Sequence, residues 1–435
     1  MSMNDEQVDL CVVGMGYVGL TLATAFALRG LTVAGVERSE AITERINAGR
    51  APFHEAGLDR AIAEVSARGR LRVVGLDEPL PAASAYAITV GTPLHDGRTS
   101  LADLESAVAR VAAGMPDGAL VILRSTVRIG TTRSVAMPIL ASSGKRFALA
   151  MCPERTIEGR ALEELHSLPQ VVGGIDRDSV ESASALFSRL GVEIVTVGTV
   201  EAAELTKLAS NTYRDMQFAF ANELAYLADT LGIDVFDVIH AANFGYERMN
   251  VARPGPVAGP CLEKDAWILA DSAQMFGTEA PLAVSIRRTN ESLVGHVFSA
   301  VSGSFSPKTA AIVGLAFKGR PETSDVRGSM AETFASQLKR RWPGIRVLGW
   351  DPLVSDADAR SIGVEPTTRE AALQGDLVVI QTNHEQFGTA DFGEAITAHA
   401  RPRAVVVDLW NQLHASAYQR DDLRIRTLGR MNAGA

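Results

Sequence analysis

The chain has 435 residues, of which 46% are hydrophobic, and it carries a formal net charge of −9 at pH 7. This length exceeds one ordinary domain, so two or three domains with substantial apolar cores are expected. The charge forms no basic stripe, which argues against nucleic acid as a partner, and no charge-free run of about 20 apolar residues predicts a membrane span. The N-terminus is polar and acidic, unlike a secretion signal. Cys11, Cys152 and Cys261 fit neither a disulfide framework nor a zinc site, so we expect a reducing, cytoplasmic setting.

The first 199 residues alternate strand-like and helical segments. An apolar run at 8–13 ends in a glycine-rich turn, residues 17–28 continue at helical spacing, and 31–36 is the next strand. Further strands are expected at 85–90, 120–123 and 147–150, with a helix at 101–111. This alternation predicts a parallel, doubly wound α/β sheet over residues 1–199.

The turn after the first strand carries a dinucleotide-binding pattern. Gly14 permits the tight turn, Gly16 lets the backbone approach a pyrophosphate, and Gly19 lets helix and strand pack closely. Glu37 follows at the end of the second strand, where a carboxylate can bind a ribose 2′-hydroxyl and repel a 2′-phosphate. NAD is therefore favoured, although Arg38 could accommodate the phosphate of NADP. The alternative is a turn whose glycines serve packing alone.

A long, uninterrupted helix is expected over residues 200–232, within a central helical domain at 200–301. Lys207 and Asn211 are four positions apart on it and could aim an ammonium and an amide at a substrate oxygen. Taken alone, such a pair is more often a solvated face. Glu154 and Arg155 follow the last strand of the first domain, at the sheet edge where open α/β folds bind ligands.

The segment 259–265 reads Gly-Pro-Cys-Leu-Glu-Lys-Asp. If a helix starts near Cys261, the thiol lies at its N-terminus beside Lys264, which favours the thiolate, and Asp265 falls one turn on. A nicotinamide site and a nucleophilic thiol together suggest an enzyme that oxidises an alcohol, captures the aldehyde covalently and oxidises it again. The alternative is a buried small hydrophobe, which is our interpretation of Cys11.

The last third, residues 302–435, resumes the strand and helix alternation after a linker at 302–307. Strands are expected at 310–314, 345–351, 377–380 and 404–407, and the tail 430–435 is expected to lack order. The predicted fold class is α/β, with two Rossmann-like doubly wound domains joined by a long central helix or helical domain.

These motifs, in this order, resemble the nucleotide-sugar 6-dehydrogenases, the family of UDP-glucose, GDP-mannose and UDP-N-acetylmannosamine dehydrogenases. The resemblance covers nearly the whole chain. The segments that carry it are 14–20, 91–93, 125–127, 152–155, Lys207 with Asn211, 259–265 and 314–318. The cysteine segment and Gly-Leu-Ala-Phe-Lys at 314–318 are the most specific of these.

The resemblance implies a four-electron oxidation in which Cys261 holds the sugar C6 as a thiohemiacetal and then as a thioester, with NAD as the acceptor. Lys207 and Asn211 would stabilise oxyanions, and Asp265 with Lys207 and a water would remove protons. Glu154 would be the base for thioester hydrolysis, and Thr126 would help to position a water and the cofactor.

The resemblance also implies two sets of binding residues. The cofactor would meet Gly14, Gly16, Tyr17, Val18, Gly19, Glu37, Arg38, Gly91, Thr92, Ser125, Thr126, Lys264 and Arg327. The nucleotide sugar would meet Glu154, Arg155, Lys207, Asn211, Arg248, Gly259, Cys261, Phe317 and Lys318, with Arg327 as a second contact to its diphosphate. The spacing from Lys318 to Asp325 is about two residues longer than the common form. Arg248 lies where the family often supplies an arginine to a neighbouring subunit, which implies a homodimer.

Within the family, residues 152–162 look more like the N-acetylated amino-sugar branch, so a UDP-linked sugar and UDP-N-acetylmannosamine in particular are favoured. UDP-N-acetylglucosamine, UDP-glucose and GDP-mannose are the alternatives. A two-electron β-hydroxyacid dehydrogenase would share the first domain and the Lys-Asn face, but would need neither Cys261 nor a second α/β domain. A non-catalytic NAD-binding protein is the third class. The yield of NADH distinguishes the three classes: two per sugar for the nucleotide-sugar dehydrogenase, one for the hydroxyacid dehydrogenase and none for the non-catalytic protein.

Overall fold

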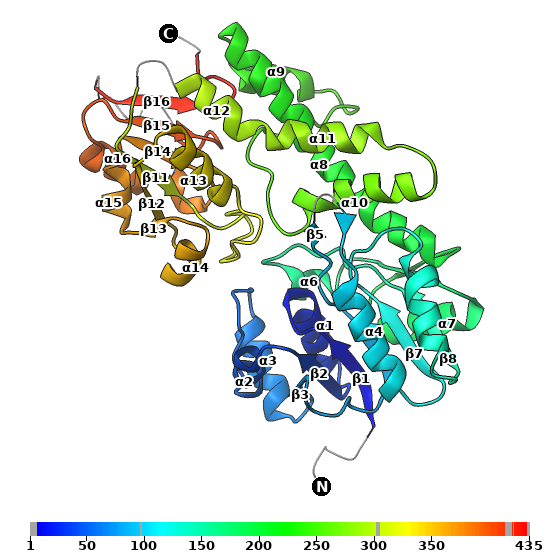
Figure 1. Cartoon of the computed structure of the whole chain (residues 1–435). Coiled ribbons are helices and arrows are strands. Elements are labelled where there is room, and N and C mark those ends of the chain that lie inside the picture. Colours follow the sequence, from blue (N-terminus) through cyan, green and yellow to red (C-terminus); the bar gives the residue numbers. More distant parts are fainter. Residues whose placement is uncertain (1–6, 96–97, 302–304, 414–419, 421, 433–435) are drawn as a thin grey trace. The chain divides into compact units, whose positions relative to one another are not determined.

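The structure is a computed structural model that describes residues 7–95, 98–301, 305–413, 420 and 422–432. It comprises two compact units, each with a twisted sheet covered by helices (Figure 1). Unit 1 contains Met1–Ser210 and Ile268–Glu279, and unit 2 contains Asn211–Trp267 and Ala280–Ala435. Both units are α/β, which confirms the predicted fold class.

Unit 1 is built on an eight-stranded sheet of order β10-β9-β8-β7-β4-β1-β2-β3. All neighbouring strands are parallel except β8 and β9, which are antiparallel. The strands are β1 (Val8–Val13), β2 (Val33–Glu37), β3 (Leu71–Gly75), β4 (Ala83–Ile88), β7 (Ala119–Leu123), β8 (Phe147–Met151), β9 (Gln170–Gly174) and β10 (Ile194–Val197), with a separate hairpin of β5 (Leu94–His95) and β6 (Arg98–Thr99). The helices are α1 (Tyr17–Leu28), α2 (Glu40–Asn47), α3 (Leu58–Ala67), α4 (Ala102–Gly114), a π-helical turn (Thr132–Ala136), α5 (Met137–Ala141), α6 (Ala161–Glu164) and α7 (Arg177–Ser188).

Strand β1 shows why this sheet needs helices on both faces. Leu10 and Val12 are buried in the core cluster on one face, whereas Cys11 and Val13 are buried in the cluster on the other. Successive side chains of a strand point to opposite faces, so a strand with four consecutive apolar residues, 10–13, must be covered on both faces. The thiol of Cys11 is fully buried, which confirms its interpretation as a small core residue, and burial raises its pKa to about 12.

Unit 2 repeats the architecture with a six-stranded, wholly parallel sheet of order β13-β12-β11-β14-β15-β16. Its strands are β11 (Thr309–Val313), β12 (Arg346–Trp350), β13 (Glu365–Pro366), β14 (Leu377–Ile380), β15 (Val405–Asp408) and β16 (Arg424–Thr427). Its helices are α9 (Val235–Asn243), α11 (Pro281–Glu291), α12 (Leu293–Val301), α13 (Met330–Arg341), α14 (Asp356–Ser361), α15 (Arg369–Leu373), a 3₁₀ turn (Glu385–Gly388) and α16 (Ala390–His399). Ala310 and Ile312 face one core cluster, and Ala311 and Val313 face the other.

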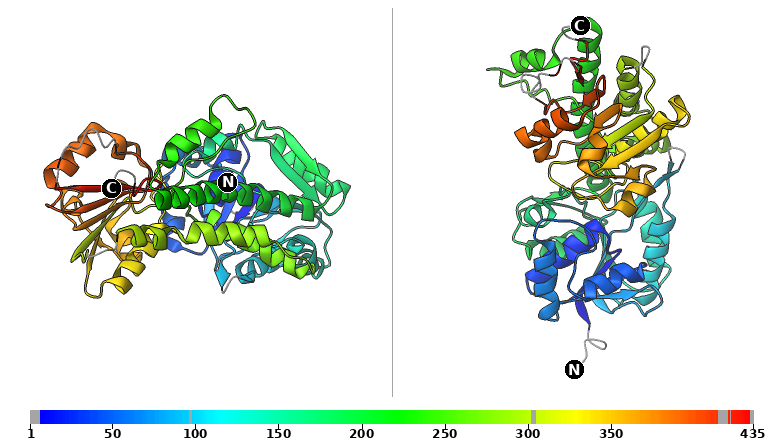
Figure 2. Two further views of the ribbon diagram at one scale, coloured as in Figure 1. Left: turned by 90° about the horizontal axis from the view of Figure 1, so that it is seen from above. Right: turned by 90° about the vertical axis from the view of Figure 1, so that its left-hand side faces the viewer.

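Two helices belong to both units. The predicted long helix is observed as α8 (Val200–Leu231), which Figure 2 shows as one continuous rod. It passes from unit 1 to unit 2 after Ser210, and α10 (Leu262–Met275) passes from unit 2 to unit 1 after Trp267. Residues 200–301 are therefore divided between the two units. The division into domains at 1–199, 200–301 and 302–435 stays a prediction. No helix among the described residues combines the length and the apolarity that crossing a membrane requires.

The C-terminal tail differs from its prediction. Met431 is fully buried and its N–H donates to Asp229 Oδ1 at 2.6 Å, while the Asn432 amide donates to the Asp229 carbonyl at 2.9 Å. The expected lack of order is therefore wrong for 430–432, because a buried carboxylate on α8 binds this segment. Residues 433–435, and residues 302–304 of the predicted linker, lie outside the described residues.

Candidate active site

The glycine turn between β1 and α1 has the geometry that its spacing predicts. Gly14 has φ +95°, a left-handed conformation that favours glycine, and a Cβ on Gly19 would lie 1.9 Å from the Gly14 carbonyl oxygen. Thr89 Oγ1 donates to that same carbonyl at 2.6 Å. A Cβ on Gly16, in contrast, would meet no atom within 4 Å. Gly16 at the start of α1 therefore leaves room for a ligand, whereas Gly19 is needed for packing.

Glu37 closes this turn from the neighbouring strand. Its Oε2 accepts the Met15 N–H at 2.9 Å, and its Oε1 accepts the N–H groups of Arg38 and Ser39 at 2.9 and 3.0 Å. A carboxylate offers about four acceptor positions, so one remains for a ribose hydroxyl. The exposed Arg38 guanidinium is 3.7 Å from Asp103. An open Gly16, a helix N-terminus and this acid together fit an NAD molecule without a 2′-phosphate.

The next two predicted segments meet at the carboxyl ends of β4 and β7. Thr92 Oγ1 donates to the Thr126 carbonyl at 2.5 Å, and Ser125 Oγ donates to the Val90 carbonyl at 2.6 Å. Gly91 between them is exposed. Because β8, β7, β4, β1 and β2 are contiguous and parallel, all these residues lie along one edge of the sheet.

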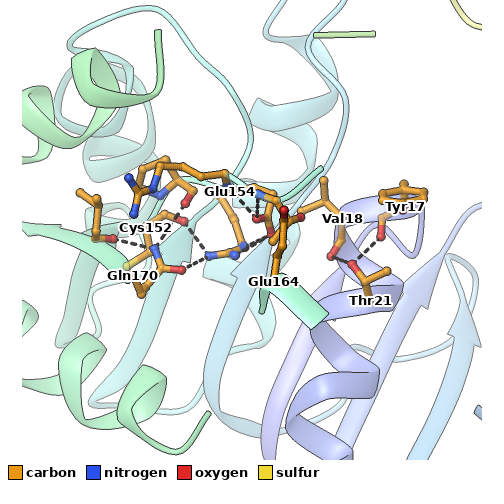
Figure 3. A network of polar contacts seen from close by, with 12 residues as sticks. Tyr17, Val18, Thr21, Cys152, Glu154, Glu164 and Gln170 are labelled. Atoms are coloured by element: carbon orange, nitrogen blue, oxygen red, sulfur yellow. Dashed lines mark hydrogen bonds and ion pairs between the residues drawn. The ribbon is translucent and has the colours of Figure 1, made fainter. Parts of the chain in front are cut away.

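Glu154, at the same edge, is the centre of a buried polar network that is drawn in Figure 3. The fully buried Arg124 donates to Glu154 Oε2 through Nε at 3.1 Å and through Nη2 at 2.6 Å. Its Nη1 donates to the Cys152 carbonyl and to Gln170 Oε1 at 3.0 and 2.8 Å. Glu154 Oε1 accepts the N–H groups of Arg155 and Thr156 at 2.7 and 2.8 Å. Both carboxylate oxygens are therefore held.

Burial alone would raise the pKa of Glu154, but the net shift is downward. The Arg124 charge, the Thr156 N–H and the more distant Lys207 ammonium together hold the pKa of this carboxyl below its ordinary value. Glu154 is therefore ionised at neutral pH. Lys207 itself is buried on α8 within unit 1. Cys152 is also buried, which raises its pKa to about 12 and makes it a poor nucleophile.

The loop after Glu154 is hydrogen-bonded to the first residue of α1. The Gly159 N–H donates to the Tyr17 hydroxyl and to Glu55 Oε2, both at 2.6 Å. The Val18 carbonyl accepts the Thr21 hydroxyl at 3.2 Å within the helix. Tyr17 thus connects the cofactor turn with the segment 157–161. The Arg155 guanidinium donates to the Pro169 carbonyl.

In unit 2, Cys261 immediately precedes α10, as its sequence predicts. Its side chain is exposed and forms no disulfide, and its carbonyl accepts the N–H groups of Lys264 and Asp265 at 3.2 and 3.0 Å. Gly259 just before it has φ +98°, and a Cβ there would lie 2.4 Å from the Phe317 ring. The thiol therefore lies at the positive end of a helix, on a loop packed directly against the residue that precedes Lys318.

Asp265 is fully buried and joins Asn211 to the thiol helix. Asn211 Nδ2 donates to Asp265 Oδ2 at 2.6 Å, and Lys264 Nζ is 3.3 Å from Oδ1 of the same carboxylate. Unit 2 therefore gathers an amide, a carboxylate and an ammonium around the first turn of α10. The order of charges along this helix was readable from the sequence, but the contact with Asn211 depends on the fold.

The remaining predicted binding residues are more exposed. Lys318 Nζ lies 5.2 Å from the Phe317 ring centroid, and Arg248 stacks on Tyr246 at 4.8 Å. Arg327 donates through Nε to Asp325 at 2.8 Å. The structure thus groups the cofactor turn, Thr126, Glu154 and Lys207 in unit 1, and Asn211, Cys261, Asp265 and Phe317 in unit 2.

Comparison with known proteins decides the family. Three sequence models match the chain: the NAD binding domain of the UDP-glucose/GDP-mannose dehydrogenase family over residues 8–191, its central domain over 201–292 and its UDP binding domain over 311–415. The chain belongs to the UDP-glucose/GDP-mannose dehydrogenase family. It is an NAD-dependent nucleotide-sugar 6-dehydrogenase, and the hydroxyacid dehydrogenase and non-catalytic classes are set aside.

Individual relatives agree with this assignment. UDP-N-acetyl-D-mannosamine dehydrogenase of Pyrococcus horikoshii is 32% identical over 91% of this chain and 94% of its own length. An NDP-N-acetyl-D-galactosaminuronic acid dehydrogenase of Ralstonia nicotianae is 32% identical over 89% of this chain and 94% of its own. The solved structure of the Pyrococcus horikoshii UDP-N-acetylmannosamine enzyme superposes with a TM-score of 0.86 at 31% identity, covering 98% of this chain and 100% of that one.

The two glycines of the cofactor turn should respond differently to the same added methyl group. We expect Gly16→Ala to leave the unfolding midpoint unchanged, because its Cβ meets no protein atom, and to weaken NAD binding about tenfold, or ~1.4 kcal/mol, where the pyrophosphate must approach. Gly19→Ala should lower the unfolding midpoint, because its Cβ overlaps the Gly14 carbonyl. Urea titration and calorimetric NAD titration of both variants check this. Equal effects of the two variants on stability would contradict it.

Arg124→Met should reverse the pH dependence at Glu154. In the wild type the lowered pKa means that this carboxylate stabilises the fold above its unfolded pKa of about 4.3 and loses that contribution as pH falls through the folded value. Without the Arg124 cation we expect the pKa of the buried carboxyl to be raised. The loss of unfolding free energy caused by Arg124→Met, about 3–5 kcal/mol at pH 7.5, should therefore become smaller toward pH 5. Urea unfolding at both values measures this. The control is Arg146→Met, at an exposed ion pair, which should change little at either pH.

Proposed function

We propose that this dehydrogenase oxidises the C6 hydroxyl of a UDP-N-acetylhexosamine, with UDP-N-acetylmannosamine favoured, to the uronate through a covalent intermediate on Cys261. The observation that carries the proposal is the exposed Cys261 thiol at the start of α10, one turn from the Asp265 carboxylate that binds Asn211. The names of the Pyrococcus and Ralstonia relatives, both N-acetylated sugar enzymes, support the sugar class. UDP-N-acetylglucosamine, UDP-glucose and GDP-mannose are the alternative substrates.

The proposed chemistry balances over two oxidations. The alcohol first loses a hydride and a proton to give the aldehyde. The Cys261 sulfur then bonds to the aldehyde carbon, and the oxygen takes a proton to give a thiohemiacetal, which keeps one hydrogen on carbon. Loss of that hydride and of the hydroxyl proton gives a thioester. Water adds to the thioester carbon, the carbon–sulfur bond breaks, and the thiol and carboxylate are released.

Each side chain has a role that its surroundings support. Lys207 and Asn211 would stabilise the oxyanions by donating to them. Asp265, whose Oδ1 lies 3.3 Å from Lys264 Nζ, would remove protons together with Lys207 and a water. Glu154 would be the base for hydrolysis, since its lowered pKa keeps it in the acceptor form, and Thr126 would orient the water.

Bound NAD would accept the hydride of each oxidation. The chain's part is to hold the cofactor at the β1–α1 turn, with Gly16 admitting the pyrophosphate and Glu37 binding the ribose. Lys264 and Arg327 would border the cofactor, and Phe317, Lys318, Gly259 and Arg155 would hold the nucleotide sugar. A thiol nucleophile must stay reduced, which is the condition of the cytoplasm.

A homodimer is part of the proposal. Tyr213, Phe220 and Leu227 recur at seven-residue intervals on α8 and are 59%, 52% and 55% exposed, and Leu231 extends this stripe at 69%. A contiguous exposed apolar stripe on a helix is typical of a protein interface, and the same stripe on a second copy is its simplest complement. Arg248 would then reach the sugar of the neighbouring subunit.

The stoichiometry of NADH tests the proposed reaction. Purified wild type should produce two NADH and one uronate from one of UDP-N-acetylmannosamine, UDP-N-acetylglucosamine, UDP-glucose or GDP-mannose. Cys261→Ser should produce no free uronate, because an ester on serine hydrolyses far less readily in this site. Absorbance at the NADH band and product mass are the measurements. Full turnover by Cys261→Ala, or one NADH per sugar in the wild type, would refute the thioester route.

The α8 stripe makes the dimer testable. Phe220→Glu with Leu227→Glu places two carboxylates in the proposed interface, where desolvation and mutual repulsion oppose association, so we expect a monomer by sedimentation velocity. The matched control, Thr333→Glu with Ser336→Glu, adds the same charge to exposed positions of α13 and should stay dimeric. A wild type that sediments as a monomer, or a stripe variant that stays dimeric, would rule out this interface.

A further inference from the structure

A buried polar network in unit 2 lies behind the segment that carries Cys261. Its members are Arg287 and Asn290 on α11, and Asp215 and Asn222 on α8, each 1% exposed or less. Four polar side chains buried between two helices are costly unless each has partners. Their partners include both ends of the loop 255–262, which contains the thiol.

The network fixes the end of this loop at the start of α10. Arg287 Nη1 donates to the Leu262 carbonyl at 3.0 Å and to Asp215 Oδ1 at 2.7 Å. Asn290 Nδ2 donates to the same Asp215 Oδ1 at 2.7 Å. The guanidinium is thereby anchored on α8 while it holds the residue next to Cys261.

The same network fixes the beginning of the loop. Asn222 exchanges two hydrogen bonds with Gly255: its Nδ2 donates to the Gly255 carbonyl at 3.1 Å, and the Gly255 N–H donates to its Oδ1 at 2.8 Å. Asn222 Nδ2 also donates to Asn290 Oδ1 at 2.9 Å, which joins the two ends through side chains. Between them, the Gly259 N–H donates to the Gly328 carbonyl at 3.0 Å.

We infer that Arg287 is a positioning residue for Cys261, and that the Asp215–Asn290–Asn222 chain lets it set the direction of the thiol by clamping both ends of the loop 255–262. The inference rests on the proposed nucleophilic role of Cys261. Arg287 reaches the loop through the backbone, so its effect is on orientation and not on substrate contact. A displaced reacting atom costs rate even when binding is unaffected, because a near-attack geometry is lost.

Alternatively, the network serves the stability of unit 2 only. Buried ion pairs are weak sources of net stability, since desolvation offsets most of the attraction, so a gain in stability alone is a poor explanation for this one. The two functions differ in what they change. A stabilising network alters the unfolding midpoint, whereas a positioning network also alters kcat and the reactivity of the thiol.

Arg287→Lys tests the inference in the full-length enzyme. It keeps the charge beside Asp215 but not the planar guanidinium that reaches the Leu262 carbonyl. We expect kcat to fall about tenfold, while KM for the nucleotide sugar and for NAD changes less than about twofold. The matched control is Arg288→Lys, at the exposed neighbouring position, which should leave both constants unchanged.

Alkylation of Cys261 by iodoacetamide gives a second readout that needs no turnover. If Arg287 holds the thiol at the N-terminus of α10, the pH at half-maximal alkylation should rise in Arg287→Lys, because the loosened thiol loses the helix field that favours the thiolate. Peptide mass spectrometry resolves the three cysteines, and the buried Cys11 and Cys152 should stay unmodified.

Asn222→Ser removes the hydrogen bonds to Gly255 at the beginning of the loop. It provides a second test of the inference if Arg287→Lys folds poorly. It should lower kcat with KM unchanged, and the double variant should lose less than the product of the single effects, since both act on one loop. An altered unfolding midpoint with unchanged kcat and unchanged alkylation profile would overturn the inference. Failure of the proposed function would appear separately, as uronate formation by Cys261→Ala.

Discussion

The structure depends on one interaction that occurs once in each unit: a carboxylate at the end of the second strand holds the backbone turn that follows the first. In unit 1, Glu37 accepts the N–H of Met15, directly after Gly14. In unit 2, Asp351 accepts the N–H groups of Leu315 and Ala316, directly after Gly314. Both glycines have a left-handed φ, +95° and +83°. In both units the strand therefore leaves the sheet through a turn that combines a left-handed glycine with a carboxylate from the neighbouring strand.

This interaction explains how the turn at the carboxyl edge of each sheet is ordered without a continuing helix or strand. A turn with unpaired N–H groups would cost about 1–3 kcal/mol for each buried donor. In unit 2, Asp351 satisfies two of them in the turn after β11, and its other oxygen accepts the N–H groups of Leu353 and Val354 in the segment after β12. The carboxylate thus accepts the N–H groups that the carbonyls of a continuing helix or strand would otherwise accept. The turn is therefore ordered without a bound nucleotide.

Sequence reasoning found what depends on local pattern. The strand at 8–13, the helix at 17–28 and the long helix near 200–232 were predictable because apolar periodicity and glycine position are local properties. The start of α10 after Cys261 was predictable for the same reason. The antiparallel pairing of β8 with β9 was not predictable from the sequence. The direction of a strand depends on the path of the intervening chain, and the residue types of the strand do not indicate it.

The buried partners of the candidate residues could not be predicted from the sequence either. Arg124 follows an apolar strand in the sequence and reads as an ordinary surface charge, yet it is 2% exposed and holds Glu154. Arg287 reads as one of two adjacent arginines on a helix, and only the fold shows which of the two is buried. Such residues pair over long sequence separations, so the contact that defines them exists only after folding.

The two buried arginines have a common relation to the proposed chemistry. Arg124 holds a carboxylate and the Cys152 carbonyl of the loop after β8, and Arg287 holds a carboxylate and the Leu262 carbonyl beside Cys261. Each pairs one acid with one backbone oxygen at the base of a segment that carries a candidate catalytic residue. A charge pair buried in this way adds little net stability but tolerates little displacement, because either partner left alone would be costly. A reaction with two hydride transfers and one covalent intermediate needs the same atoms in the same place several times in succession, and a guanidinium fixed between an acid and a carbonyl supplies that constancy.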